Sequence, residues 1–150
     1  MVFMEEMFFT SKQASEITGC TLRQLQYWRE KGVVVPVVHG TGKGRSVYYS
    51  RSDLVALAVM EYCLSVGLSF DLASVTIKTL KEKEPEFSNP TKRMRFMLWR
   101  ETSERSLELV KFDLEQAIAS LRSGQPTIPI WLDAIHQRVA RRLKEWGNGS

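Results

Sequence analysis

The arrangement of the first two helices follows from residues 10–32, which read TSKQASEITGCTLRQLQYWREKG. Thr10 and Gln13 have the spacing of a capping box. Thr21 and Gln24 repeat that spacing, so a helix is expected to begin after each threonine. A glycine ends each pattern, as is common at helix C-termini. Two short helices joined by a tight glycine turn are typical of a helix-turn-helix.

The second helix, residues 21–31, presents a polar face that would suit DNA. Leu22 and Leu25 are expected to point inward with part of the Tyr27–Trp28 pair, and polar side chains fall on the opposite face. Arginine pairs with guanine and glutamine with adenine in a major groove, while a tyrosine hydroxyl can donate to phosphate. The candidate DNA-binding residues of this helix are Thr21, Arg23, Gln24, Gln26, Tyr27 and Lys31. A helical hairpin with a solvated polar face would show the same pattern.

Residues 33–50 change to a strand-like pattern, with valines at 33–35 and 37–38 and SVYY at 46–49. Between these stretches, HGTGKGR at residues 39–45 makes a basic, glycine-rich tip. A P-loop would lead into a helix, whereas a strand follows here, so nucleotide binding is not expected. A basic hairpin directly after a helix-turn-helix is a wing, and Lys43 and Arg45 are its candidate contacts to DNA backbone or minor groove.

Two further helices complete the expected DNA-binding domain. Ser50 and Asp53 have the spacing of a third capping box. The helix that they begin is expected to end at Gly67, and a fourth helix follows. Residues 1–84 are therefore predicted to form a mainly α, winged helix-turn-helix domain of four helices and a two-stranded wing, followed by a linker at 85–90.

The sequence from residue 91 to residue 122 is predicted to form one long helix. Apolar residues recur in its later part in steps of three and four, which is typical of a coiled-coil seam. A helix of about 30 residues would span about 45 Å and could not be buried by one chain, so a second copy is expected to pair with it. The predicted dimer interface comprises Leu107, Val110, Leu114, Ile118 and Leu121.

Residues 123–150 are predicted to hold a short amphipathic helix and a tail. SGQP at 123–126 breaks the preceding helix, and the last helix runs from about residue 129 to residue 146. Its apolar side comprises Leu132, Ile135, Val139, Leu143 and Trp146. Its basic side comprises Arg138, Arg141, Arg142 and Lys144. That basic side is either a solvated surface or a further contact with DNA or a partner.

Composition excludes several classes of protein. The chain of 150 residues is 43% hydrophobic and 25% charged, so it can bury a core. No apolar run approaches the roughly 20 residues that cross a bilayer, and acidic Glu5 and Glu6 argue against a signal peptide, so no membrane partner is expected. Two cysteines cannot form a disulfide framework, which favours a cytoplasmic protein.

The net charge of +4 is unevenly distributed. It is +2 over residues 1–50, −2 over residues 51–90 and +4 over residues 91–150. Basic charge at the start of the chain suits a nucleic-acid surface there.

Four segments together resemble the MerR family of transcription regulators. GCTLRQLQYW at 19–28 resembles the second helix of that family, as do the glycine and proline that follow at 32 and 36. Tyr49–Leu54 resembles the family's Tyr-Ser-x-x-Asp-Leu segment, and Val66–Phe70 resembles the joint between its third and fourth helices. The spacing agrees over residues 8–84, a little more than half of the chain.

The resemblance implies a winged helix-turn-helix and a homodimer that binds a palindromic promoter, which it bends and untwists so that RNA polymerase can engage. Arg23 takes the position of a DNA-contacting arginine, and Tyr27 that of a backbone-contacting tyrosine. Arg45 lies in the wing, where the family carries a basic residue. Tyr49 takes the position of the wing-closing tyrosine, which packs or touches phosphate. The sequence departs from the family pattern at Gln26, Trp28 and Arg29.

No metal, cofactor or catalytic site is expected. Residues 64–150 contain no cysteine and only one histidine, His136, so they offer no set of metal ligands. Cys20 and Cys63 are expected to be small buried residues rather than redox sensors. No Ser/His/Asp set or nucleotide loop indicates an enzyme. The C-terminal aromatic residues either line an effector pocket or belong to the core, so an effector is not specified.

Three functions are compatible with these features. The first is a dimeric promoter-binding regulator. The second is an architectural or excisionase-like protein that bends DNA with the same wing, and the third is a protein-interaction module that no longer reads DNA. The long helix favours the first over the second. Binding to DNA that weakens steeply with salt would exclude the third.

Overall fold

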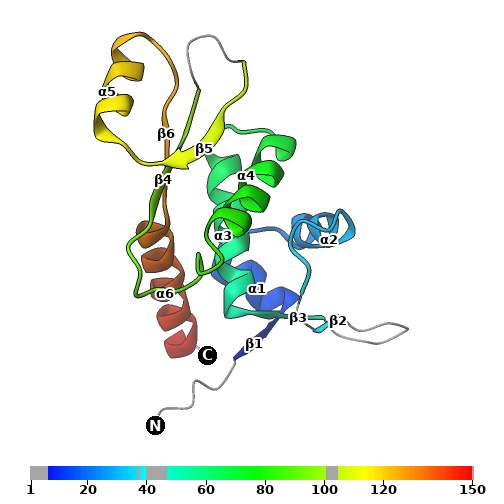
Figure 1. Cartoon of the computed structure of the whole chain (residues 1–150). Coiled ribbons are helices and arrows are strands. Elements are labelled where there is room, and N and C mark those ends of the chain that lie inside the picture. Colours follow the sequence, from blue (N-terminus) through cyan, green and yellow to red (C-terminus); the bar gives the residue numbers. More distant parts are fainter. Residues whose placement is uncertain (1–6, 37, 40–46, 101–104, 150) are drawn as a thin grey trace.

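The structure is a computed structural model that describes residues 7–36, 38–39, 47–100 and 105–149. The first half of the chain forms helices α1 to α4 and a small sheet, and the second half forms another sheet with α5 and α6 (Figure 1). Among the described residues, no helix has the length and apolar character needed to span a membrane.

Helices α1 (Ser11–Thr18), α2 (Leu22–Glu30) and α3 (Arg51–Ser65) each begin at a predicted capping box. In α3, for example, Ser50 Oγ accepts a hydrogen bond from the Asp53 backbone N–H at 3.1 Å, and an Asp53 carboxylate oxygen accepts from the Ser50 N–H at 2.9 Å. Helix α4 (Phe70–Lys83) follows after the turn at Gly67. The chain therefore enters three helices through the same local hydrogen bonds.

The first sheet sets the starting points of α1 and α3. Its strands β1 (Phe8–Thr10), β3 (Val47–Ser50) and β2 (Val38–His39) are antiparallel in the order β1-β3-β2. β1 leads directly into α1, and β3 leads directly into α3. Strand β1 was not predicted from the sequence.

Helix α3 is the centre of the first half. Residues 54–60 and Cys63 are all buried, so this helix is covered on every side. It contacts α1, α4 and α6. A helix that is apolar all round is stable only inside a protein.

The long helix predicted over residues 91–122 is wrong. In its place lie strands β4 (Arg95–Trp99) and β5 (Glu108–Lys111) and the short helix α5 (Leu114–Arg122). Strand β6 (Ile128–Trp131) completes an antiparallel sheet in the order β5-β4-β6.

The physical reason lies in the middle of β4. Phe96, Met97 and Leu98 are all buried, because this central strand is covered on both faces. A short run of consecutive apolar residues fits a buried strand as well as a helix. The five predicted seam residues therefore cannot share one helix: Val110 lies in β5, and Leu107 lies just before it.

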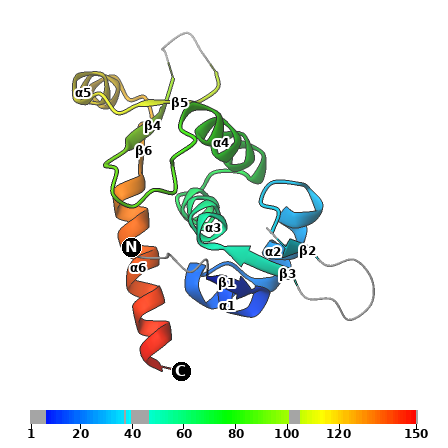
Figure 2. The same ribbon diagram turned by 60° about the horizontal axis from the view of Figure 1, so that its bottom comes forward.

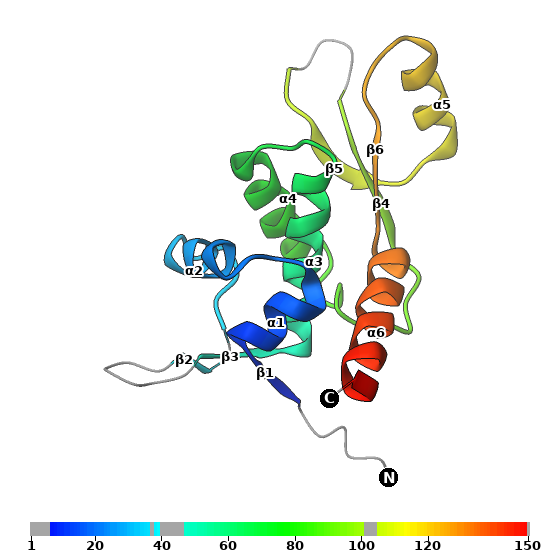
Figure 3. The ribbon, with the colours of Figure 1, turned by 180° about the vertical axis from the view of Figure 1, so that it is seen from behind.

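Helix α6 (Leu132–Gly149) returns to the first half and packs against α1 and α3 (Figures 1 and 3). Its predicted apolar side is buried or half-buried, which confirms that assignment. Tyr62 on α3 donates a hydrogen bond to the Pro129 carbonyl oxygen at 2.5 Å. His136 Nε2 lies 2.9 Å from the carbonyl oxygen of Phe87, which is buried within the predicted linker.

Candidate nucleic-acid interface

Helix α2 and strands β2 and β3 lie on one side of the molecule, away from α5 and α6 (Figures 1 and 2). Leu25 and Trp28 are almost completely buried and anchor α2 in the core. Because these residues are three positions apart, they define one inward face of the helix. The opposite face of α2 is left to solvent.

The outward face carries most of the predicted contacts. Arg23, Gln26 and Lys31 are exposed. Gln26 Nε2 donates a hydrogen bond to Glu30 Oε1 at 3.2 Å, one turn further along the same face.

Leu22 differs from its prediction, since its side chain is 55% exposed rather than turned inward. It is the first residue of α2 and lies at the edge of the buried face. An exposed leucine next to Arg23 could contact the methyl group of a thymine. The sequence gives no signal for this outward position.

Thr21 and Gln24 are already engaged within the protein. Thr21 Oγ1 accepts from the Gln24 N–H at 3.0 Å, and Gln24 Oε1 accepts from the Thr21 N–H at 2.9 Å. These two predicted contact residues therefore close the first turn of α2, where the positive end of the helix dipole favours an anion.

Tyr27 is partly exposed and held by neighbours on both sides. Its ring centroid lies 5.0 Å from that of Phe70, the first residue of α4, and Lys31 Nζ lies 5.6 Å from the Tyr27 ring centroid. Tyr27, Lys31 and Phe70 thus form one surface that joins the end of α2 to the start of α4. The place of Phe70 beside Tyr27 could not be deduced from spacing along α4.

Tyr49 is completely buried, so a direct contact of its ring with DNA is excluded in this conformation. It lies on β3, between β1 and β2. Arg29 Nη1 donates a hydrogen bond to Tyr49 Oη at 3.4 Å. Of the two alternatives, packing and phosphate contact, the structure favours packing. The predicted wing residues Lys43 and Arg45 lie outside the described residues.

The two cysteines are buried, as predicted. Burial raises the pKa of the Cys20 thiol to about 12, and the same cause raises the pKa of Cys63 to about 12. Neither thiol is therefore poised as a thiolate. In the described part of the chain, no three His, Cys, Asp or Glu side chains come together as metal ligands.

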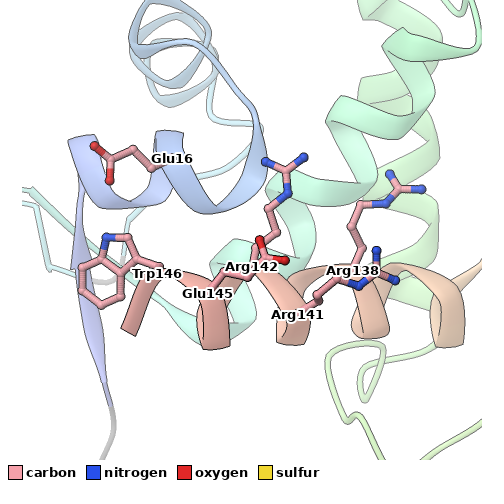
Figure 4. A pocket seen from close by; sticks show the side chains of 6 residues that line it. All are labelled: Glu16, Arg138, Arg141, Arg142, Glu145 and Trp146. Atoms are coloured by element: carbon pink, nitrogen blue, oxygen red, sulfur yellow. The ribbon is translucent and has the colours of Figure 1, made fainter. Parts of the chain in front are cut away.

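A second charged surface lies between α6 and α1, on the side away from α2 (Figures 1 and 4). It is an open hollow of about 600 Å³ lined by Glu16, Arg138, Arg141, Arg142, Glu145 and Trp146. Arg138 Nη1 also lies 3.9 Å from a carboxylate oxygen of Glu61. The two glutamates of the lining, together with the nearby Glu61, offset the charges of the three arginines, so this surface has little net charge to attract a polyanion.

Residues 9–81 match the family described as MerR HTH family regulatory protein. The match covers α1 to α4 except for the last two residues of α4, together with nearly all of the first sheet. These residues are a helix-turn-helix domain of the MerR family.

Curated relatives agree with this assignment over the same part of the chain. They are HTH-type transcriptional regulators, described as uncharacterised, of Mycobacterium bovis and of two strains of Mycobacterium tuberculosis. Each is 30% identical to this chain over 76 residues, which are 50% of this chain and 34% of the relative. The matched region therefore spans only about a third of each relative's length.

Proposed function

We propose that this chain is a cytoplasmic transcription regulator that binds double-stranded DNA as a homodimer at a palindromic promoter site. The observation that carries the proposal is the outward face of α2, which is polar and basic within a MerR-type domain. Nine helical residues span about 13.5 Å and cover only a half-site, so two copies related by a twofold axis would read a palindrome. The proposed function includes neither an effector nor an enzymatic activity.

In this proposal, α2 enters the major groove with Arg23 at a base edge. Arg23 would pair with a guanine, Gln26 with an adenine, and Leu22 would contact a thymine methyl group. Tyr27 and Lys31, held against α4, would contact phosphate. The capped first turn of α2 would orient its N-terminus toward a phosphate.

The hairpin after α2 would act as a wing, with Lys43 and Arg45 on the DNA backbone or in the minor groove. Contacts from the helix and the wing on each copy would distort the DNA between the half-sites. Such distortion would allow RNA polymerase to engage a promoter with an over-long spacer. A DNA-bending architectural protein would use the same surface, so the position of the binding site relative to a promoter decides between the two functions.

The experiment is DNase I footprinting of the DNA upstream of the chain's own coding sequence, over a salt series from about 50 to about 200 mM. The proposal predicts a protected palindrome and an affinity that falls steeply with salt. Altered cleavage at the central base pairs would support distortion. The absence of protection even at the lowest salt would overturn the proposal and favour a protein-interaction module.

Arg23→Ala tests the contact assignment in the same assay. If Arg23 reads a base, the substitution costs about 1–3 kcal/mol of binding free energy and relaxes the preference at one position of the site. Arg141→Ala removes another exposed arginine, on α6 at the other side of the molecule, and should leave binding unchanged. If Arg23→Ala instead weakens binding equally for all DNA sequences, Arg23 contacts phosphate rather than a base.

A further inference from the structure

A groove of about 250 Å³ lies between helix α4 and strand β5, where the first half of the chain meets the second sheet (Figures 1 and 2). Its helical wall comprises Leu72, Val75, Thr76, Thr79 and Lys83. Its other wall comprises Leu98 of β4 and residues 107–110. Phe70, which contacts Tyr27, lies on a different face of α4, so the groove is separate from the candidate nucleic-acid interface.

Strand β5 offers the groove an open backbone edge. In the sheet order β5-β4-β6, β5 pairs with β4 alone. The Phe112 N–H donates to the Arg95 carbonyl oxygen at 3.0 Å, which fixes the alternation of the ladder. Residues 108 and 110 therefore bond to β4, and the N–H and C=O groups of Leu109 and Lys111 point away from it. Such an edge can accept one more strand.

Apolar side chains line the groove beside that edge. Leu109 is buried and lies directly opposite Leu98 in the ladder, so the two side chains share the sheet face that α4 adjoins. Val75 lines the same groove from α4 and is 58% exposed, because no described residue covers it fully. An open backbone edge and an incompletely covered apolar wall thus occur at one place.

Two opposite charges mark the ends of β5. Glu108 and Lys111 are exposed, and neither forms an ion pair with another residue in the described part of the chain. Charges on an edge strand discourage pairing with an arbitrary strand. An incoming antiparallel strand is favoured when it carries an acidic residue opposite Lys111 and a basic residue opposite Glu108.

We propose that this groove binds an extended peptide segment of a partner protein, which adds to β5 as an antiparallel strand alongside α4. The segment reads acidic, apolar, apolar, basic in the N-to-C direction. Its third residue lies opposite Leu109 and fills the groove beside Val75. Main-chain hydrogen bonds supply affinity, and the side chains supply specificity. This inference goes beyond the proposed function and does not depend on it.

A second copy of this chain fits the groove poorly, although β5 itself reads ELVK and so has the required order of charges. Antiparallel pairing of two β5 strands would place both α4 helices on the same sheet face, and α4 packs against this outermost strand. Helices about 10 Å across cannot both lie over strands that are about 4.8 Å apart. The favoured occupant is therefore a strand without a helix over its own edge.

Selection of random heptapeptides displayed on phage, with the immobilised full chain as bait, tests the site. The wild-type chain should enrich the acidic-apolar-apolar-basic motif. Val75→Glu places a charge in the groove and should abolish that enrichment. Val66→Glu makes the same change at another exposed valine, outside the groove, and should retain it. Circular dichroism and thermal melting establish that both variants are folded.

Charge reversal tests the register. A chain that carries both Glu108→Lys and Lys111→Glu should enrich peptides of the opposite order, basic-apolar-apolar-acidic. Both positions are exposed, so the fold should tolerate the two substitutions. Enrichment of an unchanged motif on this variant would show that the peptide does not pair with β5 in the proposed register.

N-methylation of a synthetic peptide tests the backbone contact. The peptide carries the enriched motif, and fluorescence anisotropy measures its affinity for the wild-type chain. A methyl group on the backbone nitrogen of the third motif residue removes the donor to the Leu109 carbonyl oxygen and should lower the affinity about tenfold or more. The same change at the second residue, whose N–H points away from β5, should leave the affinity unchanged.

Three results would overturn the inference. They are the absence of the motif among peptides enriched on the wild-type chain, its persistence on Val75→Glu, and equal effects of the two N-methylations. Sedimentation equilibrium of the free chain provides a further check on the occupant. A dimer that dissociates in Val75→Glu but not in Val66→Glu would place a second copy in the groove and would also contradict the proposal. DNA footprints play no part in these measurements, so failure here leaves the proposed function unaffected.

Discussion

At the scale of single residues, Gly19 fixes the turn between α1 and α2. Its φ of +84° lies in the left-handed region, and its N–H donates to the Ser15 carbonyl oxygen at 2.9 Å. A β-carbon at this position would lie 3.9 Å from Glu61 Cγ, which is an ordinary contact. The requirement for glycine is therefore one of backbone conformation rather than of space.

Gly19→Ala should lower the free energy of unfolding by about 1–2 kcal/mol, since an L-residue is strained in the left-handed region. Urea denaturation measures this change. Gly147→Ala, within α6, is the matched control and should be neutral or slightly stabilising, because alanine is the better helix former. Equal effects of the two substitutions would show that the backbone of Gly19 carries no special strain.

The candidate interface shows which residue roles can be deduced from sequence. Helical spacing correctly separated buried Leu25 from exposed Arg23, because one inward face is decided by period alone. Spacing also predicted that Gln24 closes a capping box with Thr21. It could not show that the Tyr49 hydroxyl accepts a hydrogen bond from Arg29, because only the folded chain brings these two residues together.

At the scale of elements, capping explains why the helices of the first half were predictable. Each begins at a short polar signal that acts within four residues. The second half lacks comparable signals at its strands: β5 has only four residues, and β4 pairs with β6 across a long stretch of sequence, as Phe96 does with Ile130. The second half does contain one such local signal, because Asp113 caps α5 by accepting a hydrogen bond from the Gln116 N–H at 3.1 Å.

Ser50→Ala tests the contribution of one cap. Its hydroxyl oxygen accepts from the Asp53 N–H at the start of the central helix α3, so its removal should cost about 1 kcal/mol of stability. The midpoint of urea unfolding should fall accordingly. Ser106→Ala, at an exposed position before β5, should leave the midpoint in place. A midpoint unchanged in both variants would mean that α3 is held by packing alone.

At the scale of the whole molecule, α6 joins the two halves. Its His136 is buried and lies against the Phe87 carbonyl oxygen, in the segment that follows α4. Burial lowers the pKa of His136 below its ordinary value, and the positive charge of Arg51 acts in the same direction. The hydrogen bond to Phe87 and the charge of Asp133 oppose the shift without cancelling it.

The lowered pKa predicts how stability depends on pH. Between the lowered pKa of the folded state and about 6.5, the unfolded chain binds a proton at His136 that the folded chain does not. Stability should therefore fall as pH decreases below about 6.5 and level off once the folded histidine is also protonated. Urea unfolding from pH 5 to pH 8 measures the slope, and His136→Gln should flatten it. If the stability of the wild-type protein and that of His136→Gln depend on pH in the same way, titratable groups other than His136 cause the dependence.

Contact between Phe9 and Trp146 has a consequence for the order of folding. These rings lie 6.3 Å apart, although 137 positions separate them along the chain. Contacts between residues so distant in sequence form slowly. During synthesis the helix-turn-helix leaves the ribosome long before α6 is made, so the surface of β1 and α1 that α6 covers stays uncovered in the nascent chain. A chaperone that binds apolar segments would have that interval in which to act.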